Sequence, residues 1–147
     1  MFVFSSDVDR VDRALVHRWL SEESYWAKGR SRADQDAAMA ASRNYGVYEE
    51  PTGRQVGYAR LVTDGVFFGW LCDVFVDAAA RGKGIGKMLV SGVLDDVTPR
   101  GPKRIVLATA DAQGLYEQFG WAELSGEMTW MVRIRPDAEP AGDAPLA

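Results

Sequence analysis

The sequence contains a single cysteine, Cys72, and a single histidine, His17. One cysteine excludes an intramolecular disulfide framework and a multi-cysteine zinc site, and it fits a reducing compartment. No apolar run approaches the roughly 20 residues that a membrane-spanning helix needs. Acidic residues at positions 7, 9 and 12 occupy the region where a secretory signal would be basic and then apolar. These absences predict a cytoplasmic protein.

Positive charge is also in short supply, since 17 Lys and Arg face 21 Asp and Glu, a net charge of −4. Such a chain has no general attraction for nucleic acids or anionic membranes, so neither is expected as a partner. The 147 residues, 47% of them apolar, suit one globular domain with a real core. We expect this domain to span residues 1–135, followed by an extended or mobile Pro- and Ala-rich tail at 136–147.

The spacing of apolar residues predicts an α+β domain with a mixed, mostly antiparallel twisted sheet of about six to seven strands and about four flanking helices. Because an amphipathic helix separates two apolar strands, a right-handed crossover should place a parallel pair in the centre of the sheet. The first helix should start at Ser5-Ser6-Asp7 and end near Ser21. The other expected helices are 33–43, 85–97 and 112–118, and the expected strands are 1–4, 45–48, 55–62, 66–76, 105–108, 121–124 and 128–134.

A glycine-rich turn, Arg81-Gly82-Lys83-Gly84-Ile85-Gly86-Lys87, lies between the strand expected at 66–76 and the next helix. Free N–H groups at the helix start, together with three cations, form a local anion cradle that suits a diphosphate. The Walker spacing is absent because Arg81 stands at the place of its first glycine, and the dinucleotide G-x-G-x-x-G spacing is absent too. An ordinary strand-to-helix bend with solvated lysines is the alternative interpretation.

Arg81, Gly84 and Gly86 form an Arg-x-x-Gly-x-Gly pattern after Val74-Phe75-Val76, and this resembles motif A of the GNAT superfamily of acyl-CoA-dependent N-acyltransferases. The segment 115–121, Leu-Tyr-Glu-Gln-Phe-Gly-Trp, is similar to a second motif of that superfamily. The resemblance covers roughly residues 1–135 and implies a GNAT-like fold with a splayed parallel pair and acetyl-CoA as acyl donor. The chain departs from the common pattern at Ala78-Ala79-Ala80, at Thr109 and at Trp121.

The same resemblance implies a role for each residue of the motifs. The backbone of Val74, Phe75 and Val76 would bind the pantetheine arm. Residues 82–87 would hold the pyrophosphate, with Arg81 closing the loop. Thr109 stands where an asparagine that contacts the pantetheine is frequent. The hydroxyl of Tyr116 would point at the departing sulfur, and the N–H of Val74 or Phe75 would polarise the carbonyl. The cofactor-binding set is Val74, Phe75, Val76, Arg81, Gly82, Lys83, Gly84, Ile85, Gly86, Lys87 and Thr109.

Acyl transfer to an amine requires a neutral amine, and the only histidine lies on the first helix, away from the turn. The base is then a carboxylate or a water chain. Asp73, within an apolar run, is the first candidate because desolvation there would raise its pKa, although an acid in a strand also pairs with arginine or faces solvent. Glu22 and Glu23 are weaker candidates. A phenol is a weaker acid than a thiol, so the main contribution of Tyr116 should be a hydrogen bond to the thiolate.

Tyr25 and Trp26 lie in an irregular segment and are expected to line an acceptor pocket. A small cationic or aromatic amine is favoured as acceptor over a protein lysine or N-terminus, and direct attack in a ternary complex is the expected mechanism. No metal is expected, and Cys72 should be a small buried hydrophobe. The alternative functions are a non-catalytic acyl-CoA-binding regulatory module and a structural partner-binding domain. A homodimer formed through the final strands is a further expectation.

Overall fold

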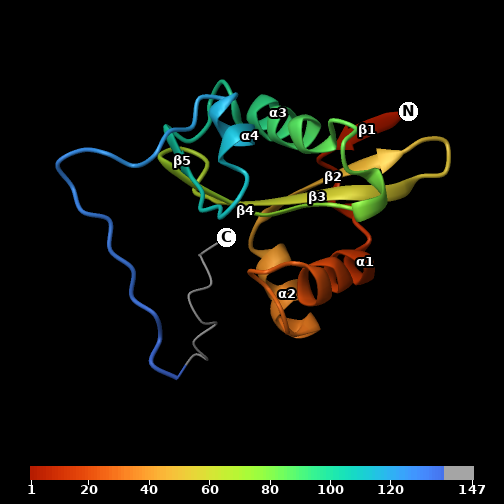
Figure 1. The fold of residues 1–147 in the computed structure, drawn as a ribbon, viewed down its shortest axis with the longest axis horizontal. Coiled ribbons are helices and arrows are strands. Elements are labelled where there is room, and N and C mark those ends of the chain that lie inside the picture. The colour runs from red at the N-terminus through yellow and green to blue at the C-terminus, as the bar shows by residue number, and fades with distance from the viewer. Residues whose placement is uncertain (138–147) are drawn as a thin grey trace.

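The protein is described here by a computed structural model. The described residues are 1–137, so the tail expected at 136–147 falls outside them from position 138 on. Five strands form one sheet in the order β1-β2-β3-β4-β5 (Figure 1). All neighbours are antiparallel except β4 and β5, which are parallel. The strands are β1 (Phe2–Ser5), β2 (Arg43–Glu49), β3 (Arg54–Thr63), β4 (Phe68–Val76) and β5 (Arg104–Val106). The α+β class and the parallel pair are confirmed.

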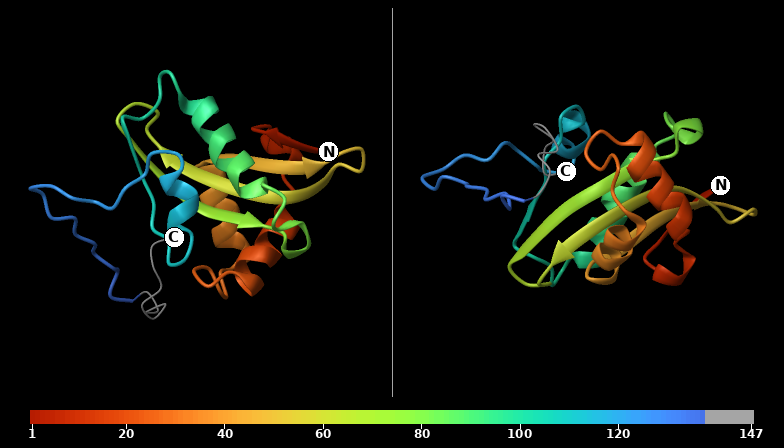
Figure 2. Two further views of the ribbon diagram at one scale, coloured as in Figure 1. Left: turned by 45° about the horizontal axis from the view of Figure 1, so that its top comes forward. Right: turned by 90° about the horizontal axis from the view of Figure 1, so that it is seen from below.

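Helices cover both faces of the sheet (Figures 1 and 2). On one face lie α1 (Arg13–Arg18) and α2 (Arg32–Ala40), and on the other lie α3 (Ile85–Val97) and α4 (Gln113–Glu117). No helix within residues 1–137 combines the length and apolar character needed to cross a membrane. About four helices were expected, and residues 1–137 contain four α-helices.

The first helix begins later than the sequence predicts. Asp7 caps only a 3-10 turn, Val8–Arg10, whereas the carboxylate of Asp12 accepts the N–H of Leu15 and caps α1. The helix then continues into a π-helical turn, Trp19–Glu23. Several acidic residues stand near this start, and only the one that reaches the third following N–H acts as the cap.

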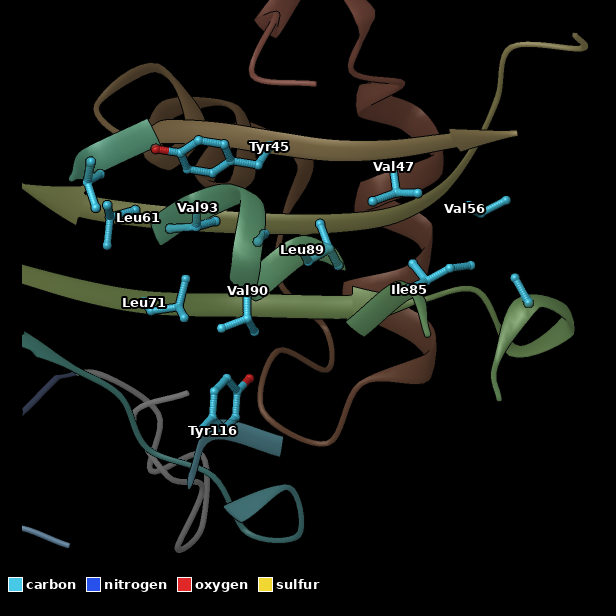
Figure 3. Close-up of a cluster of buried hydrophobic side chains, with 13 residues drawn as sticks. Tyr45, Val47, Val56, Leu61, Leu71, Ile85, Leu89, Val90, Val93 and Tyr116 are labelled. Carbon is cyan, nitrogen blue, oxygen red and sulfur yellow. The ribbon is translucent and has the colours of Figure 1, made fainter. Parts of the chain in front are cut away.

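The core on the α3 side forms where apolar side chains of α3 meet those of β2, β3 and β4 (Figure 3). A Cβ added to Gly57 of β3 would stand 3.0 Å from Ile85 Cγ2 and 3.2 Å from Leu89 Cδ1. The helix can therefore approach the sheet this closely only because residue 57 lacks a side chain. This packing fixes the start of α3, and with it the glycine-rich turn, over the end of β4.

The closing strands expected at 121–124 and 128–134 are absent, because the chain from residue 122 runs away from β5 and forms no ladder with it. The described sheet has five strands rather than six to seven. The parallel pair consequently lies at one edge instead of the centre. Alternating apolar residues predict a strand, but a strand also needs a neighbour to complete its hydrogen bonds, and this segment pairs with no strand among residues 1–137.

Candidate active site

The parallel pair separates soon after it forms. Only Phe68–Trp70 of β4 pair with β5, in register with Arg104–Val106. From Leu71 on, β4 has no partner on that side within residues 1–137. The predicted splay is therefore present, and it leaves backbone groups of the second half of β4 free to bind something other than a strand.

A β-bulge interrupts β4 within this unpaired half. Tyr58 pairs with Phe75 and Arg60 pairs with Cys72, so two residues of β4, Asp73 and Val74, face one residue of β3. Asp73 has a φ of 52°, a left-handed conformation that aspartate and asparagine tolerate better than other side chains. The extra residue changes the direction of the neighbouring side chains and increases the twist of the strand.

The Asp73 carboxylate is fully buried and has three donors. Arg30 Nη1 lies 2.8 Å and Arg60 Nε 2.9 Å from one oxygen, and Trp26 Nε1 lies 2.9 Å from the other. The side chains of Arg30 and Arg60 are themselves only 22% and 13% exposed. One carboxylate thus ties the loop that carries Trp26 and Arg30 to the sheet.

The predicted pKa of Asp73 is wrong in direction. Burial does raise the pKa of the Asp73 carboxyl, but hydrogen bonds and charges from Arg30 and Arg60 outweigh it and hold the pKa below its ordinary value. The sequence predicted the desolvation and could not identify the two cations. A carboxylate held by two guanidinium groups is a poor proton acceptor at neutral pH.

This direction predicts how stability depends on acid. A carboxyl whose pKa is lowered by folding stabilises the protein above its unfolded pKa, about 3.9, and that stability is lost as the pH falls further, through the folded pKa. The free energy of unfolding should therefore fall more steeply below about pH 4 in the wild type than in Asp73→Asn. Urea unfolding across a pH series measures this, and equal slopes for the two proteins would contradict the ion network.

A cavity of about 70 Å³ opens where β4 and the segment after β5 part. Tyr25 and Trp26 line it, in contact through an edge-to-face pair with ring centroids 4.8 Å apart. The hydroxyl of Tyr25 accepts the N–H of Ala110 at 3.0 Å, which joins the loop to the far wall. Two carboxylates lie in the lining, those of Asp73 and of the exposed Asp111, whereas Glu22 and Glu23 do not line it.

Tyr116 is held by α4 in the wall of the same cavity. Its ring packs edge-to-face on Trp121, with centroids 5.8 Å apart, and joins the α3-side core (Figure 3). Its hydroxyl makes no hydrogen bond with a described residue, and burial raises the pKa of Tyr116 to about 12. The phenol is therefore protonated at neutral pH and has a hydrogen to donate into the cavity.

The glycine-rich turn leads from β4 into α3. Gly82 and Gly84 have φ of 79° and 81°, and a Cβ at either would meet nothing within 4 Å, so open space lies in front of the turn. Gly84 is the N-cap of the 13-residue helix α3 and offers no capping side chain, which leaves the first N–H groups of the helix available. This arrangement fits an anionic diphosphate.

The three cations of the turn differ in their contacts. Arg81 Nε donates to the carbonyl of Val76 at 3.1 Å, and its guanidinium lies 5.3 Å from the centroid of Phe75, so Arg81 ties the turn to the end of β4. Lys83 and Gly82 are exposed, and Lys87 is also exposed on the first turn of α3.

Three other residues named in the sequence analysis, Thr109, Cys72 and His17, have structural roles. The hydroxyl of Thr109 accepts the N–H of Ala112 at 3.0 Å and holds the approach to α4. Cys72 is buried, and burial raises its thiol pKa to about 12, which suits a small hydrophobe and not a nucleophile. His17 Nε2 lies 2.8 Å from the carbonyl of Arg30 and supports the loop. Among residues 1–137, no three His, Cys, Asp or Glu side chains gather as metal ligands.

Sequence reasoning missed Arg30, Arg60 and Asp111. An acidic residue inside an apolar strand signals that a cation must come near, but 43 residues separate Arg30 from Asp73, and nothing local identifies that arginine among the others. Asp111 lies in the loop between β5 and α4, where an exposed acid carries no distinguishing signal.

Comparison with known proteins agrees with this geometry. Residues 13–121 match the acetyltransferase (GNAT) family. The chain is 30% identical over 117 residues to glucosamine 6-phosphate N-acetyltransferase 1 of rice, covering 74% of this chain and 68% of that protein. It is 34% identical over 115 residues to serotonin N-acetyltransferase 2 of rice, covering 78% and 47%.

Solved structures show the same fold. A Xanthomonas campestris protein of the GNAT family superposes with a TM-score of 0.85 at 35% identity, over 92% of this chain and 94% of that one. Glucosamine-6-phosphate N-acetyltransferase of Arabidopsis thaliana superposes with a TM-score of 0.62 at 18% identity, over 90% and 99%. The family match spans the splayed strands, the glycine-rich turn and Tyr116, and the chain therefore belongs to the GNAT family of acetyltransferases.

Proposed function

We propose that this protein transfers the acetyl group of acetyl-CoA to a primary amine by direct attack in a ternary complex. The observation that carries the proposal is the parting of β4 from β5 after Trp70, next to an uncapped helix N-terminus and to Tyr116 in the cavity wall. Membership of the acetyltransferase family supports the reaction class.

The turn supplies the site for the pyrophosphate of acetyl-CoA. Gly82 and Gly84 leave open space where side chains would stand, and the free N–H groups at the start of α3 donate to phosphate oxygens. The residues we assign to this contact are Gly82, Lys83, Gly84, Ile85, Gly86 and Lys87. Arg81, bonded to the carbonyl of Val76, keeps the turn closed against the strand end.

The splayed half of β4 supplies the site for the pantetheine arm. Val74, Phe75 and Val76 lie beyond the last pair with β5, so an amide-bearing chain can hydrogen-bond there as an added strand would. The N–H of Val74 or Phe75, just after the bulge at Asp73, is assigned to polarise the thioester carbonyl. Thr109 supports the opposite wall through its bond to Ala112.

Tyr116 is assigned to the leaving sulfur. With a pKa of about 12 against about 8.5 for a thiol, full proton transfer from Tyr116 would be uphill by about 5 kcal/mol. Its contribution is a hydrogen bond to the developing thiolate, and a buried charge-assisted hydrogen bond of this kind is worth about 1.5–3 kcal/mol.

The acceptor amine is assigned to the cavity lined by Tyr25, Trp26 and Asp111. Its small volume, aromatic wall and exposed carboxylate favour a small cationic or aromatic amine over a protein lysine or N-terminus. Removal of the amine proton is assigned to a water chain, because Asp73 is held ionised by Arg30 and Arg60. Asp73 is a positioning residue that fixes the loop with Trp26.

The experiment on Tyr116 tests the proposal. Tyr116→Phe should lower kcat about 10- to 100-fold with little change in the melting temperature, because the lost hydroxyl has no partner among the described residues while the ring packing on Trp121 remains. Tyr48→Phe is the control, since the Tyr48 hydroxyl likewise has no described hydrogen-bond partner and a pKa raised to about 12, but Tyr48 lies on β2. An unchanged kcat in Tyr116→Phe would overturn the assignment.

A further inference from the structure

A cavity of about 530 Å³ lies beside the first residues of β2. It shares no lining residue with the acceptor cavity, and it meets the end of α3 at Asp96, whereas the glycine-rich turn lies at the start of that helix. β1 pairs with β2 only from Gly46 to Glu49, so the edge at residues 43–45 has no partner strand on that side within residues 1–137. We call this cavity the β2 pocket. Its lining includes Ser6, Arg13, Ser42, Arg43, Tyr45 and Asp96.

The oxygen atoms in the pocket walls are already engaged. The Asp96 carboxylate accepts the hydroxyl of Tyr45 at 2.7 Å, and Figure 3 shows this hydroxyl pointing toward the end of α3. The Ser42 hydroxyl donates to the carbonyl of Ala38 at 2.7 Å and accepts from Arg60 Nη1 at 3.0 Å. These bonds hold the walls together, so the lining offers a cationic ligand few free acceptors.

The donors of the pocket, in contrast, are available. Arg13 forms no ion pair with another described residue. Arg43 Nη1 lies 3.9 Å from the Asp96 carboxylate, an ion pair too long for a hydrogen bond. Two arginines and one carboxylate give the lining a net positive charge, in a protein whose net charge is −4. A planar guanidinium binds carboxylate and phosphate oxygens through paired hydrogen bonds, so this lining favours an anion.

Part of the pocket wall is apolar. Val8 lines the pocket and is 44% exposed, and Met39 lines it from α2. An inorganic ion would leave this wall in water, whereas an anion with a short carbon skeleton would cover it. The pocket is also much larger than the acceptor cavity, at about 530 Å³ against about 70 Å³, which suits a molecule larger than a single ion.

We propose that the β2 pocket binds a small organic anion. Its carboxylate or phosphate oxygens accept hydrogen bonds from Arg13 and Arg43, and its carbon skeleton lies against Val8. The bound anion joins the start of α1, which carries Arg13, to the start of β2, which carries Arg43. The site is distinct from the glycine-rich turn, so its ligand is a second molecule and not the acyl donor.

Hydrogen bonds connect the β2 pocket to the acceptor cavity. Ser42, in the pocket wall, accepts from Arg60 Nη1, and Arg60 Nε donates to Asp73 at 2.9 Å. Asp73 in turn accepts the indole N–H of Trp26, which lines the acceptor cavity. An anion that holds the pocket walls in place should therefore also restrict Trp26 and strengthen the binding of the amine. This consequence rests on the proposed function, whereas the binding of the anion does not.

Calorimetric titration of the full chain with glutarate and with phenyl phosphate tests the site. The two probes carry a carboxylate and a phosphate on a carbon skeleton, and at least one of them should bind. Arg13→Gln and Arg43→Gln should each weaken that binding about 10- to 100-fold, because each removes charge-assisted hydrogen bonds to the anion. Both side chains are exposed, so these variants should keep the wild-type melting temperature.

Arg18→Gln is the matched control. Arg18 is an exposed arginine on the same helix, α1, and lies outside the pocket lining, so its loss should leave the affinity unchanged. The comparison also separates the β2 pocket from the glycine-rich turn, since an anion bound at the turn would not respond to Arg13 or Arg43. No binding of either probe, or binding that either Arg13→Gln or Arg43→Gln leaves intact, overturns the proposal.

Initial rates with the amine varied, with and without a saturating concentration of the probe that binds, test the link to the acceptor cavity. The KM for the amine should fall about five-fold when the probe is present. Ser42→Ala should bind the probe as the wild type does and lose this effect, because the Ser42 hydroxyl is bonded to Ala38 and Arg60. A KM that the probe leaves unchanged overturns the link. No turnover with any amine would instead overturn the proposed function, and calorimetry would still decide the β2 pocket.

Discussion

Asp73→Asn should lower the free energy of unfolding by about 3–5 kcal/mol, the cost expected when one partner of a buried ion pair is removed. The substitution removes the negative charge and little else, because asparagine accepts the left-handed backbone at φ 52° as readily as aspartate does and has nearly the same volume. It leaves the Arg30 and Arg60 guanidinium groups, both mostly buried, without their carboxylate.

The same change should loosen the loop that carries Tyr25 and Trp26. Trp26 donates to Asp73, so the wall of the acceptor cavity depends on this carboxylate. We expect KM for the amine to rise more than kcat falls, which is the signature of lost positioning rather than of a lost base. A fall in kcat with unchanged KM and unchanged stability would instead return Asp73 to the role of base.

Asp36→Asn is the matched control for the stability measurement. Asp36 also faces an arginine, Arg32 at 3.1 Å, but its side chain is 37% exposed and its partner 47%. An exposed pair of this kind contributes about 1 kcal/mol at most. Urea unfolding of the two variants against the wild type should therefore separate them clearly, and equal losses would contradict the burial argument.

Gly84→Asp should weaken the binding of acetyl-CoA at least about 100-fold, since a like charge placed against a bound anion costs several kcal/mol. Gly84 caps α3 and faces open space, so the new carboxylate would stand where we place the pyrophosphate. Gly84 has a φ of 81°, so the new side chain also introduces backbone strain, and the control has to carry the same strain.

The control for this variant is Gly53→Asp. Gly53, in the turn between β2 and β3, has a φ of 74° and likewise has nothing within 4 Å of an added Cβ. It carries the same backbone strain and the same added charge away from the glycine-rich turn. Isothermal titration calorimetry with acetyl-CoA should give wild-type affinity for Gly53→Asp. Wild-type affinity for Gly84→Asp would show that the pyrophosphate does not bind at this turn.

The parts of the site that could be predicted from the sequence are those whose signal is local. The glycine-rich turn between strand and helix is one contiguous segment, and its alternating glycines and cations already indicate an anion cradle. The parallel pair followed from the order of apolar strand, amphipathic helix and apolar strand. The family match covers these same segments.

Long-range contacts were beyond that reasoning. The low pKa of Asp73 depends on Arg30 and Arg60, which lie 43 and 13 residues away in the chain, so a prediction from desolvation alone had the wrong sign. The final strands failed for a related reason. Their alternating pattern is real, but alternation within one segment does not determine which sheet edge it pairs with, and within residues 1–137 it pairs with none.

The most direct test of acetyl transfer is the initial rate of thiol release, with acetyl-CoA and a panel of small primary amines both varied. The proposed function predicts release of CoA that depends on the amine, with intersecting lines in the double-reciprocal plots because both substrates are bound when the acetyl group moves. Binding of acetyl-CoA without amine-dependent release across the panel would contradict the enzyme and leave the acyl-CoA-binding regulatory module.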